Sequence, residues 1–261
     1  MATVKPKKFL GQHFLKDLSV AERIADTLDG FPTLPVIEVG PGMGVLTQFL
    51  IAKDRNLTVV ELDRDSVPYL HTHYPALKDH IIEGDFLKLD LSDIYKSSFC
   101  VIGNYPYNIS SQILFKVLDY KDQIPCCSGM FQKEVAERVA APPGRKSYGI
   151  LSVLIQAWYD VEYLFTVSET VFDPPPKVKS AVIRLVRNKA KELNCNEKLF
   201  KTVVKTSFNQ RRKTLRNSMK PLLGKDCEAY KDPIFDKRPE QLSVADFEML
   251  TNITERHLPK G

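Results

Sequence analysis

The sequence predicts an α/β fold in which a mostly parallel sheet is followed by a small all-helical domain. Short apolar runs alternate with helical patterns over residues 35–138, which is typical of parallel strands joined by crossover helices. Only a loop separates the strand-like runs at 159–167 and 180–187, and this favours an antiparallel hairpin at the sheet edge. Helical patterns alone follow. We therefore expect a sheet domain at residues 1–188 and a helical domain at 189–261.

The expected strands are apolar runs bounded by Gly, Pro, Asp or Asn, and the expected helices carry apolar residues at a spacing of three and four. Either Asp17 or Ser19 can cap the first helix, and either Asn108 or Ser110 can cap the helix that follows the fourth strand. The parallel strands are expected at 35–39, 57–61, 80–84, 99–103 and 128–131. The helices are expected at 17–28, from 45 onward, and at 110–118, 133–140, 147–159, 197–207, 210–219 and 243–255.

The composition is that of a folded chain with a mild basic excess. Its 261 residues, 43% of them hydrophobic, suffice for one large and one smaller domain. The net charge of +5 is compatible with a nucleic-acid partner, but its distribution is more informative. Residues 37–93 are acid-rich, whereas basic residues gather over 189–220. We expect one half to bind a cofactor and the other to face a polyanion.

Cysteine usage and hydropathy give expectations about location. Five Cys without a Cys-x-x-Cys pair or a signal peptide indicate reduced thiols, so we expect a cytoplasmic protein. The five His form no ligand spacing with the Cys, and no metal is expected. No apolar run is long enough to cross a bilayer, and no membrane partner is expected.

Glycine or polar residues stand at the ends of four successive expected strands. The first strand leads into the turn Gly40–Gly44, where glycines let the backbone approach a ligand. Glu61 ends the second, about 20 residues further on, where an acid can accept both hydroxyls of a ribose; a helix N-terminal charge is its alternative role. Asp85 follows the third strand, where it can accept from an adenine amine or cap a turn, and Asn104 follows the fourth strand. Because ligands bind at the carboxyl ends of parallel strands, one nucleoside site is predicted here.

The tetrapeptide Asn104-Tyr105-Pro106-Tyr107 suits a planar amine that is conjugated to a ring. The side-chain oxygen of Asn104 can accept one amine hydrogen, and the carbonyl of Tyr105 can accept the other because the residue before a proline is kept out of helical pairing. The ring of Tyr107 can stack on the base. These groups fit the exocyclic N6 of adenine.

Seven motifs of the sequence extend these observations. They are Lys8-Phe-Leu-Gly-Gln-His-Phe-Leu15, Glu38-Val-Gly-Pro-Gly-Met-Gly44, Val60-Glu-Leu-Asp63, Gly84-Asp-Phe86, Gly103-Asn-Tyr-Pro-Tyr-Asn-Ile-Ser110, Val171-Phe-Asp-Pro-Pro-Pro-Lys-Val178 and Phe208-Asn-Gln-Arg-Arg-Lys-Thr-Leu-Arg-Asn217. Together they resemble the ribosomal RNA small-subunit adenine dimethyltransferases of the kasugamycin-sensitivity type, over nearly the whole chain.

The resemblance implies a Rossmann-like class I methyltransferase sheet. It implies that S-adenosyl-L-methionine donates two methyl groups to N6 of each of two adjacent adenosines near the 3′ end of small-subunit rRNA. The implied partner is this rRNA within an assembling 30S-type particle, and we expect a monomer.

The chemistry of such an enzyme needs neither a metal nor a covalent catalyst. Adenine N6 is a poor nucleophile because its lone pair is delocalised, but a sulfonium methyl group is a strong electrophile. The protein must bring the two atoms to about 3 Å in line with the leaving sulfur. It must also favour the positive charge that develops on the nitrogen. An amide cannot act as a base, so Asn104 is expected to position N6 and to stabilise that charge.

The resemblance also implies roles for the remaining residues. Phe172 corresponds to a second aromatic that sandwiches the extruded adenine together with Tyr107. The arm at residues 1–16 corresponds to a lid over the cofactor, with His13 where the family often has Asn. The implied catalytic residues are Asn104, Tyr105, Pro106, Tyr107 and Phe172; the implied cofactor-binding residues are Gln12, His13, Leu15, Gly40, Gly42, Glu61, Leu62, Asp85, Phe86 and Asn104; and the implied RNA-binding residues, on a basic helix start, are Arg211, Arg212, Lys213, Arg216 and Lys220.

Four alternative functions fit part of the pattern. The erythromycin-resistance type dimethylates an adenine of large-subunit rRNA, but the stretch 208–213 and the long C-terminal tail favour the small-subunit type. DNA adenine methyltransferases often carry Asp in place of Asn104, and nicotinamide dehydrogenases use a different glycine spacing. A non-catalytic ribosome-assembly factor would not need Gly40, Glu61 and Asn104.

Overall fold

The computed structural model describes residues 6–7, 11–190 and 192–258, which form two compact units. No helix within these described ranges is both long and apolar enough to cross a membrane. Unit 1 takes in Met1–Ala136 and Asp160–Arg187; unit 2 takes in Glu137–Tyr159 and Asn188–Gly261.

This division differs from the single boundary expected at residue 188. The chain leaves unit 1 after the fifth parallel strand, contributes residues 137–159 to unit 2, and then returns to complete the sheet. The reason is packing that the sequence does not reveal: the helix within 137–159 contacts the first long helix of the C-terminal region.

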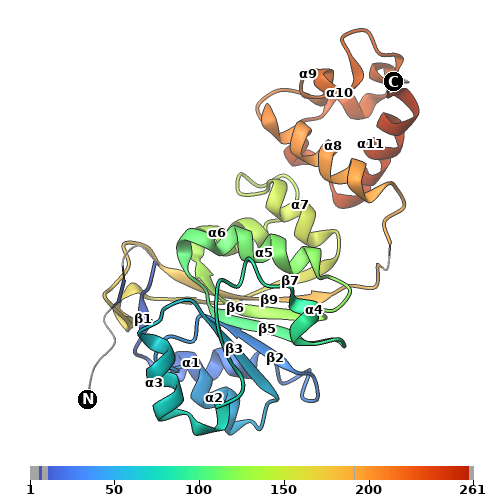
Figure 1. Ribbon diagram of the computed structural model, residues 1–261. Helices are drawn as coiled ribbons and strands as arrows, with labels where there is room; N and C mark the ends of the chain where they lie inside the picture. Colours follow the sequence, from blue (N-terminus) through green and yellow to red (C-terminus); the bar gives the residue numbers. More distant parts are fainter. Residues whose placement is uncertain (1–5, 8–10, 191, 259–261) are drawn as a thin grey trace. The chain divides into compact units, whose positions relative to one another are not determined.

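Unit 1 is built on a seven-stranded sheet with the order β4-β3-β2-β5-β6-β9-β7 (Figure 1). The five strands β2 to β6 are parallel, whereas β9 is antiparallel to β6, so the sheet is mostly parallel with an antiparallel edge, the fold class that the sequence predicts. The central strands are apolar on both sides because parallel sheets are covered on both faces. Their bounds are β2 Val36–Val39, β3 Leu57–Glu61, β4 Ile81–Glu83, β5 Cys100–Asn104, β6 Cys126–Gln132, β7 Tyr159–Val167 and β9 Ser180–Arg187.

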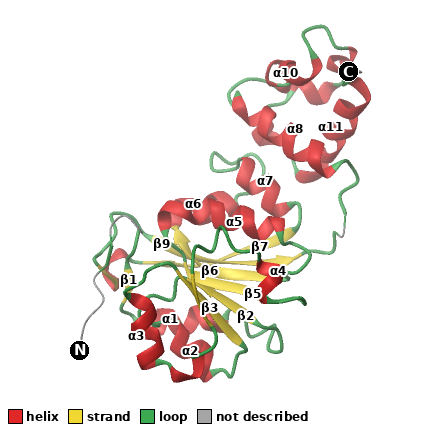
Figure 2. Cartoon of the chain, in the orientation of Figure 1, coloured by secondary structure: helices red, strands yellow, loops and turns green. Residues whose placement is uncertain are grey.

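Helices α1, α2 and α3 lie on one face of this sheet and α5 on the other (Figures 1 and 2). Asp17 caps α1, since its side chain accepts the N–H groups of Ser19 and Val20. The cap expected at Asn108 or Ser110 is wrong, because α5 continues from a 3-10 turn and has no side-chain cap. The bounds are α1 Leu18–Asp26, α2 Thr47–Ala52, α3 Ser66–His73, η2 Pro75–Leu77, α4 Leu91–Ile94, η3 Tyr107–Ile109, α5 Ser110–Asp119 and α6 Lys133–Ala140.

A two-stranded sheet joins the N-terminal segment to the segment before β9. β1 (Phe14–Leu15) pairs antiparallel with β8 (Phe172–Asp173), which follows η4 (Glu169–Val171), and places Leu15 opposite Phe172. The N–H of Lys16 extends the pairing to the carbonyl of Val171 at 2.8 Å. Strands of two residues have no readable periodicity, so the sequence did not predict this sheet.

Unit 2 is helical. Its helix α7 (Ile150–Gln156) is shorter than the expected helix at 147–159, because Tyr159 already begins β7. The helix expected at 210–219 is wrong over its first half: a turn follows α8, and α9 begins after Thr214, whose carbonyl accepts the N–H groups of Asn217 and Ser218. The bounds are α8 Glu197–Asn209, α9 Leu215–Ser218, α10 Lys220–Leu223, η5 Glu228–Lys231, η6 Pro233–Asp236, η7 Pro239–Gln241 and α11 Val244–His257.

Candidate functional site

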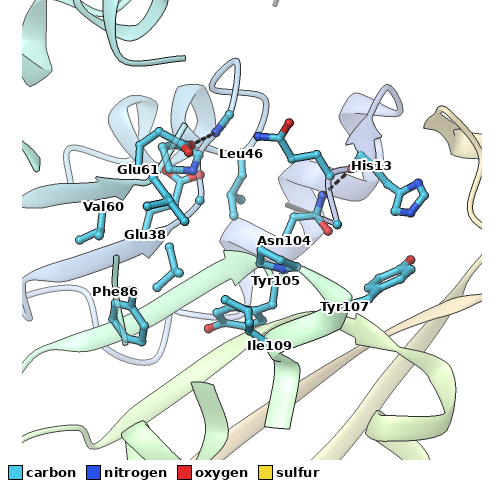
Figure 3. A pocket seen from close by; sticks show the side chains of 18 of the residues that line it. His13, Glu38, Leu46, Val60, Glu61, Phe86, Asn104, Tyr105, Tyr107 and Ile109 are labelled. Carbon is cyan, nitrogen blue, oxygen red and sulfur yellow. Dashed lines mark hydrogen bonds between the residues drawn. The ribbon is translucent and has the colours of Figure 1, made fainter. Parts of the chain in front are cut away.

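A cavity of about 310 Å³ lies at the carboxyl ends of β2, β3, β4 and β5 in unit 1 (Figure 3). The residues predicted at four separate strand ends therefore line one space, as expected for ligand sites of parallel sheets. Every predicted cofactor-binding residue and four of the five predicted catalytic residues line it: Gln12, His13, Leu15, Gly40, Gly42, Glu61, Leu62, Asp85, Phe86, Asn104, Tyr105, Pro106 and Tyr107.

Glu61 is held in place by backbone N–H groups at the end of β3 (Figure 3). Its Oε2 accepts the N–H of Gly42 at 2.9 Å, and its Oε1 accepts that of Asp63 at 2.7 Å. Burial raises the pKa of Glu61, although these two bonds oppose the rise. A carboxylate offers about four lone-pair sites, so Glu61 keeps capacity to accept from a ligand hydroxyl.

The turn after β2 requires glycine where it meets Glu61. Gly42 has a φ of 55°, in the left-handed region that side chains disfavour. A Cβ on Gly42 would lie 3.1 Å from the ring of Phe14 in β1. The turn thus presents its N–H to the carboxylate while the N-terminal segment packs closely over it.

Glu38 is a cavity residue that the sequence interpretation missed as part of the site. It lies in β2, lines the cavity and is only 1% exposed; its Oε2 accepts the hydroxyl of Thr47 at 2.7 Å. Burial raises the pKa of Glu38 to about 8 against the opposing bond from Thr47, and the nearby charge of Glu61 adds to the rise. The sequence signal for Glu38 is its place at the head of the glycine motif, two residues before Gly40.

Asp85 and Phe86 belong to a turn between β4 and α4. Asp85 Oδ1 accepts the N–H of Leu87 at 3.0 Å, and Phe86 is a buried ring on the cavity wall. From α5, the Lys116 ammonium donates to the carbonyls of Leu87 at 3.0 Å and Leu89 at 2.5 Å. This turn therefore places the carboxylate of Asp85 next to the ring of Phe86 in the cavity wall.

Asn104 bridges the end of β5 to the N-terminal segment. Its Nδ2 donates to the backbone carbonyl of His13 at 3.2 Å (Figure 3). A carbonyl can only accept, so the amide nitrogen must face it, and Oδ1 is the group left to accept from a ligand. The neighbouring Tyr105 side chain is buried, and its hydroxyl donates to the carbonyl of Ser128 at 2.9 Å, which leaves the backbone of Tyr105 at the cavity.

The rings of Tyr107 and His13 stand side by side in the cavity wall, with centroids 5.3 Å apart (Figure 3). The Tyr107 hydroxyl bonds to that of Ser180. The Nδ1–H of His13 donates to the carbonyl of Pro174 at 2.8 Å. Both rings are thus oriented by segments that belong to the last part of unit 1.

The N-terminal segment is also tied down at the end of β3. Lys7 forms an ion pair with Asp63, and Gln12 Nε2 donates to the second oxygen of Asp63 at 3.0 Å. Burial opposes ionisation of Asp63, but these bonds outweigh it and lower its pKa. The predicted basic arm also includes residues 1–5 and 8–10, which lie outside the described residues.

Phe172 is not among the residues that line the cavity, so the role of its ring against a bound base stays a prediction. The side chain is 1% exposed and packs in the hydrophobic core, opposite Leu15 of β1. Burying such a ring contributes about 1.5–3 kcal/mol, which favours core packing over an open face. Of the two predicted aromatic rings, Tyr107 alone lines the cavity.

The predicted RNA-binding residues lie in unit 2, on the turn after α8 and on α9 and α10. Arg211 donates to the backbone carbonyls of residues 145–146, and Arg216 pairs with Asp236 at 2.7 Å, so both guanidinium groups already have partners in the unit. The exposed members of the predicted set are Arg212, Lys213, Arg216 and Lys220.

The cavity has the groups that S-adenosyl-L-methionine, the implied cofactor, requires. The free lone pairs of Glu61 suit a ribose diol, Asp85 suits an adenine amine, and apolar side chains such as Leu46, Val60 and Ile109 suit the faces of a purine. Within the ranges that the structure describes, no cluster of His, Cys, Asp and Glu could hold a metal ion.

Comparisons with known proteins agree with this geometry. A family model described as "Ribosomal RNA adenine dimethylase" matches residues 3–254 of the chain. The chain is 75% identical over 260 residues to ribosomal RNA small subunit methyltransferase A of Parabacteroides distasonis, covering 100% of this chain and 98% of that relative. It is 61% identical over 258 residues to the protein of the same name from Porphyromonas gingivalis, covering 98% and 100%.

Two solved structures resemble the chain over almost its whole length. A dimethyladenosine transferase from Plasmodium falciparum has a TM-score of 0.80 at 23% identity, covering 94% of this chain and 99% of that one, and this likeness shows a shared fold. The 23S rRNA methyltransferase ErmE has a TM-score of 0.65 at 27% identity, with the same coverage.

Proposed function

The chain belongs to the ribosomal RNA adenine dimethylase family, and from this premise we propose how its cavity carries out S-adenosyl-L-methionine-dependent N6,N6-dimethylation of adenosine in small-subunit rRNA. The relatives at 75% and 61% identity are named small-subunit enzymes, whereas the large-subunit enzyme ErmE is only 27% identical. That difference favours the small subunit. The target implied by the resemblance is the pair of adjacent adenosines near the 3′ end.

For the cofactor, we propose that Glu61 accepts the ribose hydroxyls and that Asp85 accepts the adenine amine beside the ring of Phe86. The free lone pairs of Glu61 and the placement of all three side chains on one cavity wall support these roles. Gly40 and Gly42 supply the close backbone approach, and Leu62, Gln12, His13 and Leu15 complete the enclosure. When bound, S-adenosyl-L-methionine supplies an electrophilic methyl group.

For the target base, the observation that carries the proposal is the amide of Asn104. Its nitrogen is engaged by the carbonyl of His13, so its oxygen is oriented to accept one hydrogen of adenine N6. The carbonyl of Tyr105, held out of helical pairing by Pro106, accepts the other, and the ring of Tyr107 stacks on the base. These acceptors strengthen their bonds as positive charge develops on N6, which lowers the barrier.

We also propose that the protein works as a monomer in the cytoplasm, on small-subunit rRNA within an assembling 30S-type particle. The cavity supports the monomer, because all its lining residues come from unit 1 of one chain and no second copy is needed to complete it. We propose an assembling particle as the substrate because the target adenine must leave its stack and enter a cavity of about 310 Å³, which requires that the rRNA around it is still accessible.

Mass mapping of rRNA tests this function. Small- and large-subunit particles that lack the modification are incubated with the protein and labelled cofactor, and methylated adenosines are located by mass spectrometry. We expect two methyl groups on each of two adjacent adenosines near the 3′ end of small-subunit rRNA. Label in large-subunit rRNA instead would support the ErmE-like alternative. Binding of particles without transfer of label would support an assembly factor that does not catalyse.

The double variant Arg212→Glu, Lys213→Glu is expected to weaken binding of small-subunit rRNA and to flatten its salt dependence. Both side chains are exposed, and within the described part of the chain neither has an ion-pair partner, so both are available to phosphates. Each lost phosphate contact should reduce the slope of log K against log salt by about 0.7 to 0.9. Filter binding from low to high salt measures it; equal slopes in parent and variant would contradict RNA contact there. Lys225→Glu, Lys231→Glu in the same unit is the charge-matched control.

A further inference from the structure

Lys116 lies outside the residues that line the cavity, yet its ammonium is turned toward the segment that forms the wall beside Asp85 and Phe86. It donates to the carbonyls of Leu87 at 3.0 Å and Leu89 at 2.5 Å. The same ammonium lies 5.9 Å from the ring centre of Phe86. Two of its N–H groups thus donate hydrogen bonds to backbone carbonyls of one short segment rather than to solvent.

Burial of the Lys116 ammonium costs free energy of desolvation, and its hydrogen bonds to the backbone of this segment offset that cost. Burial lowers the pKa of the Lys116 ammonium, and the carboxylates of Asp90, Asp119 and Asp85 oppose that change. Residues 85–90 form neither helix nor strand, so their carbonyls need donors from elsewhere. A cation makes shorter and stronger hydrogen bonds to such carbonyls than a neutral donor does.

Tyr120, one helical turn beyond Lys116, ties down the far end of the same segment. Its hydroxyl donates to Asp90 Oδ1 at 3.0 Å and accepts the N–H of Leu91 at 3.3 Å. The ammonium of Lys116 also lies 5.4 Å from the centre of the Tyr120 ring. Tyr120 is the C-cap residue of α5, so the C-terminal part of this helix and its cap hold the segment from Leu87 to Leu91.

We propose that Lys116 is a positioning residue for the cofactor site, which fixes the turn at 85–89 in the shape that receives the adenine of S-adenosyl-L-methionine. The inference rests on the proposed function. Helix α5 would then support both substrates, because it carries Lys116 and also follows directly from the Asn104–Tyr107 motif through η3. One rigid element therefore sets the positions of the turn at the cofactor's adenine and of the segment at the target adenine.

Isothermal titration of S-adenosyl-L-methionine into the full-length chain tests the proposal. Lys116→Met keeps the length of the side chain and removes both bonds; we expect about tenfold weaker binding, because the turn must then be ordered by the ligand. The KM for the cofactor should rise by the same factor, while kcat at saturating cofactor and the KM for rRNA stay within about twofold. Hydrogen exchange of the peptide at 85–91 should become faster in the variant.

Two further variants keep the result unambiguous. Lys96→Met removes an exposed lysine of unit 1 that pairs with Asp93, and its cofactor binding should match the parent. Tyr120→Phe removes a single hydroxyl, so it should weaken cofactor binding in the same direction by a smaller factor, even if Lys116→Met folds poorly. Parent-like cofactor affinity in both Lys116→Met and Tyr120→Phe would overturn the positioning role. A parent chain that binds no cofactor would instead overturn the proposed function.

Discussion

Asn104→Ala is expected to lower kcat for adenosine dimethylation by about 10²- to 10³-fold, the usual cost of removing one aligned polar group that stabilises transition-state charge. The amide oxygen of Asn104 is oriented by the bond from its nitrogen to the carbonyl of His13 at 3.2 Å. Loss of the side chain removes an acceptor for N6 but leaves Glu61 and Asp85 in place. Affinity for S-adenosyl-L-methionine should therefore change by only a few-fold. Single-turnover kinetics and calorimetry measure the two quantities.

A second substitution at this position separates accepting from anchoring. Asn104→Asp keeps an oxygen acceptor, but its carboxylate cannot donate to the carbonyl of His13 and is repelled by it. We expect Asn104→Asp to lose most of the activity as well, and to loosen the N-terminal segment in hydrogen exchange. Asn56→Ala, at an exposed amide before β3, is the matched control and should retain parent turnover. Turnover of Asn104→Ala near that of the control would remove Asn104 from the mechanism.

Glu38→Gln is expected to abolish a large pH dependence of folding stability. The pKa of Glu38 is raised from the ordinary 4.5 to about 8 by burial, so between these pH values the folded chain holds a proton that the unfolded chain has released. The free energy of unfolding must then fall as pH rises through this window, by about 1.4 kcal/mol per pH unit. Glutamine cannot ionise, and its amide oxygen can still accept the Thr47 hydroxyl. The variant should gain stability relative to the parent as pH rises from 5 to 8, and keep that gain above pH 8.

Urea unfolding followed by far-UV circular dichroism from pH 5 to 9 measures this difference. Tryptophan fluorescence is unsuitable, because the single Trp158 belongs to unit 2 whereas Glu38 belongs to unit 1. Glu83→Gln, which removes a half-exposed carboxylate paired with Arg64 at the end of β4, should follow the pH profile of the parent. Parallel profiles for Glu38→Gln and the parent would show that Glu38 does not carry the buried proton.

The candidate site could be predicted from the sequence wherever its residues depend on chain order. Gly40, Glu61, Asp85 and Asn104 each follow a strand, and parallel strands connected by crossover helices must bring their carboxyl ends to one edge. The residues that line the cavity can therefore be predicted from their positions after successive strands in the sequence. Segments without a strong hydrophobic period are harder to predict. The basic stretch at 210–214 is a turn, although its composition suits a helix.

The sequence by itself determined the family, the parallel sheet with its antiparallel edge and the identity of most cavity residues, because these follow from local periodicity and strand order. Only the tertiary structure decided what those side chains contact. Asn104 and His13 are 91 residues apart in the sequence, and Phe172 turns into the core because a two-residue strand pairs it with Leu15. Contacts of this kind leave no periodic pattern in the chain, since they depend on how distant segments pack once the sheet has formed.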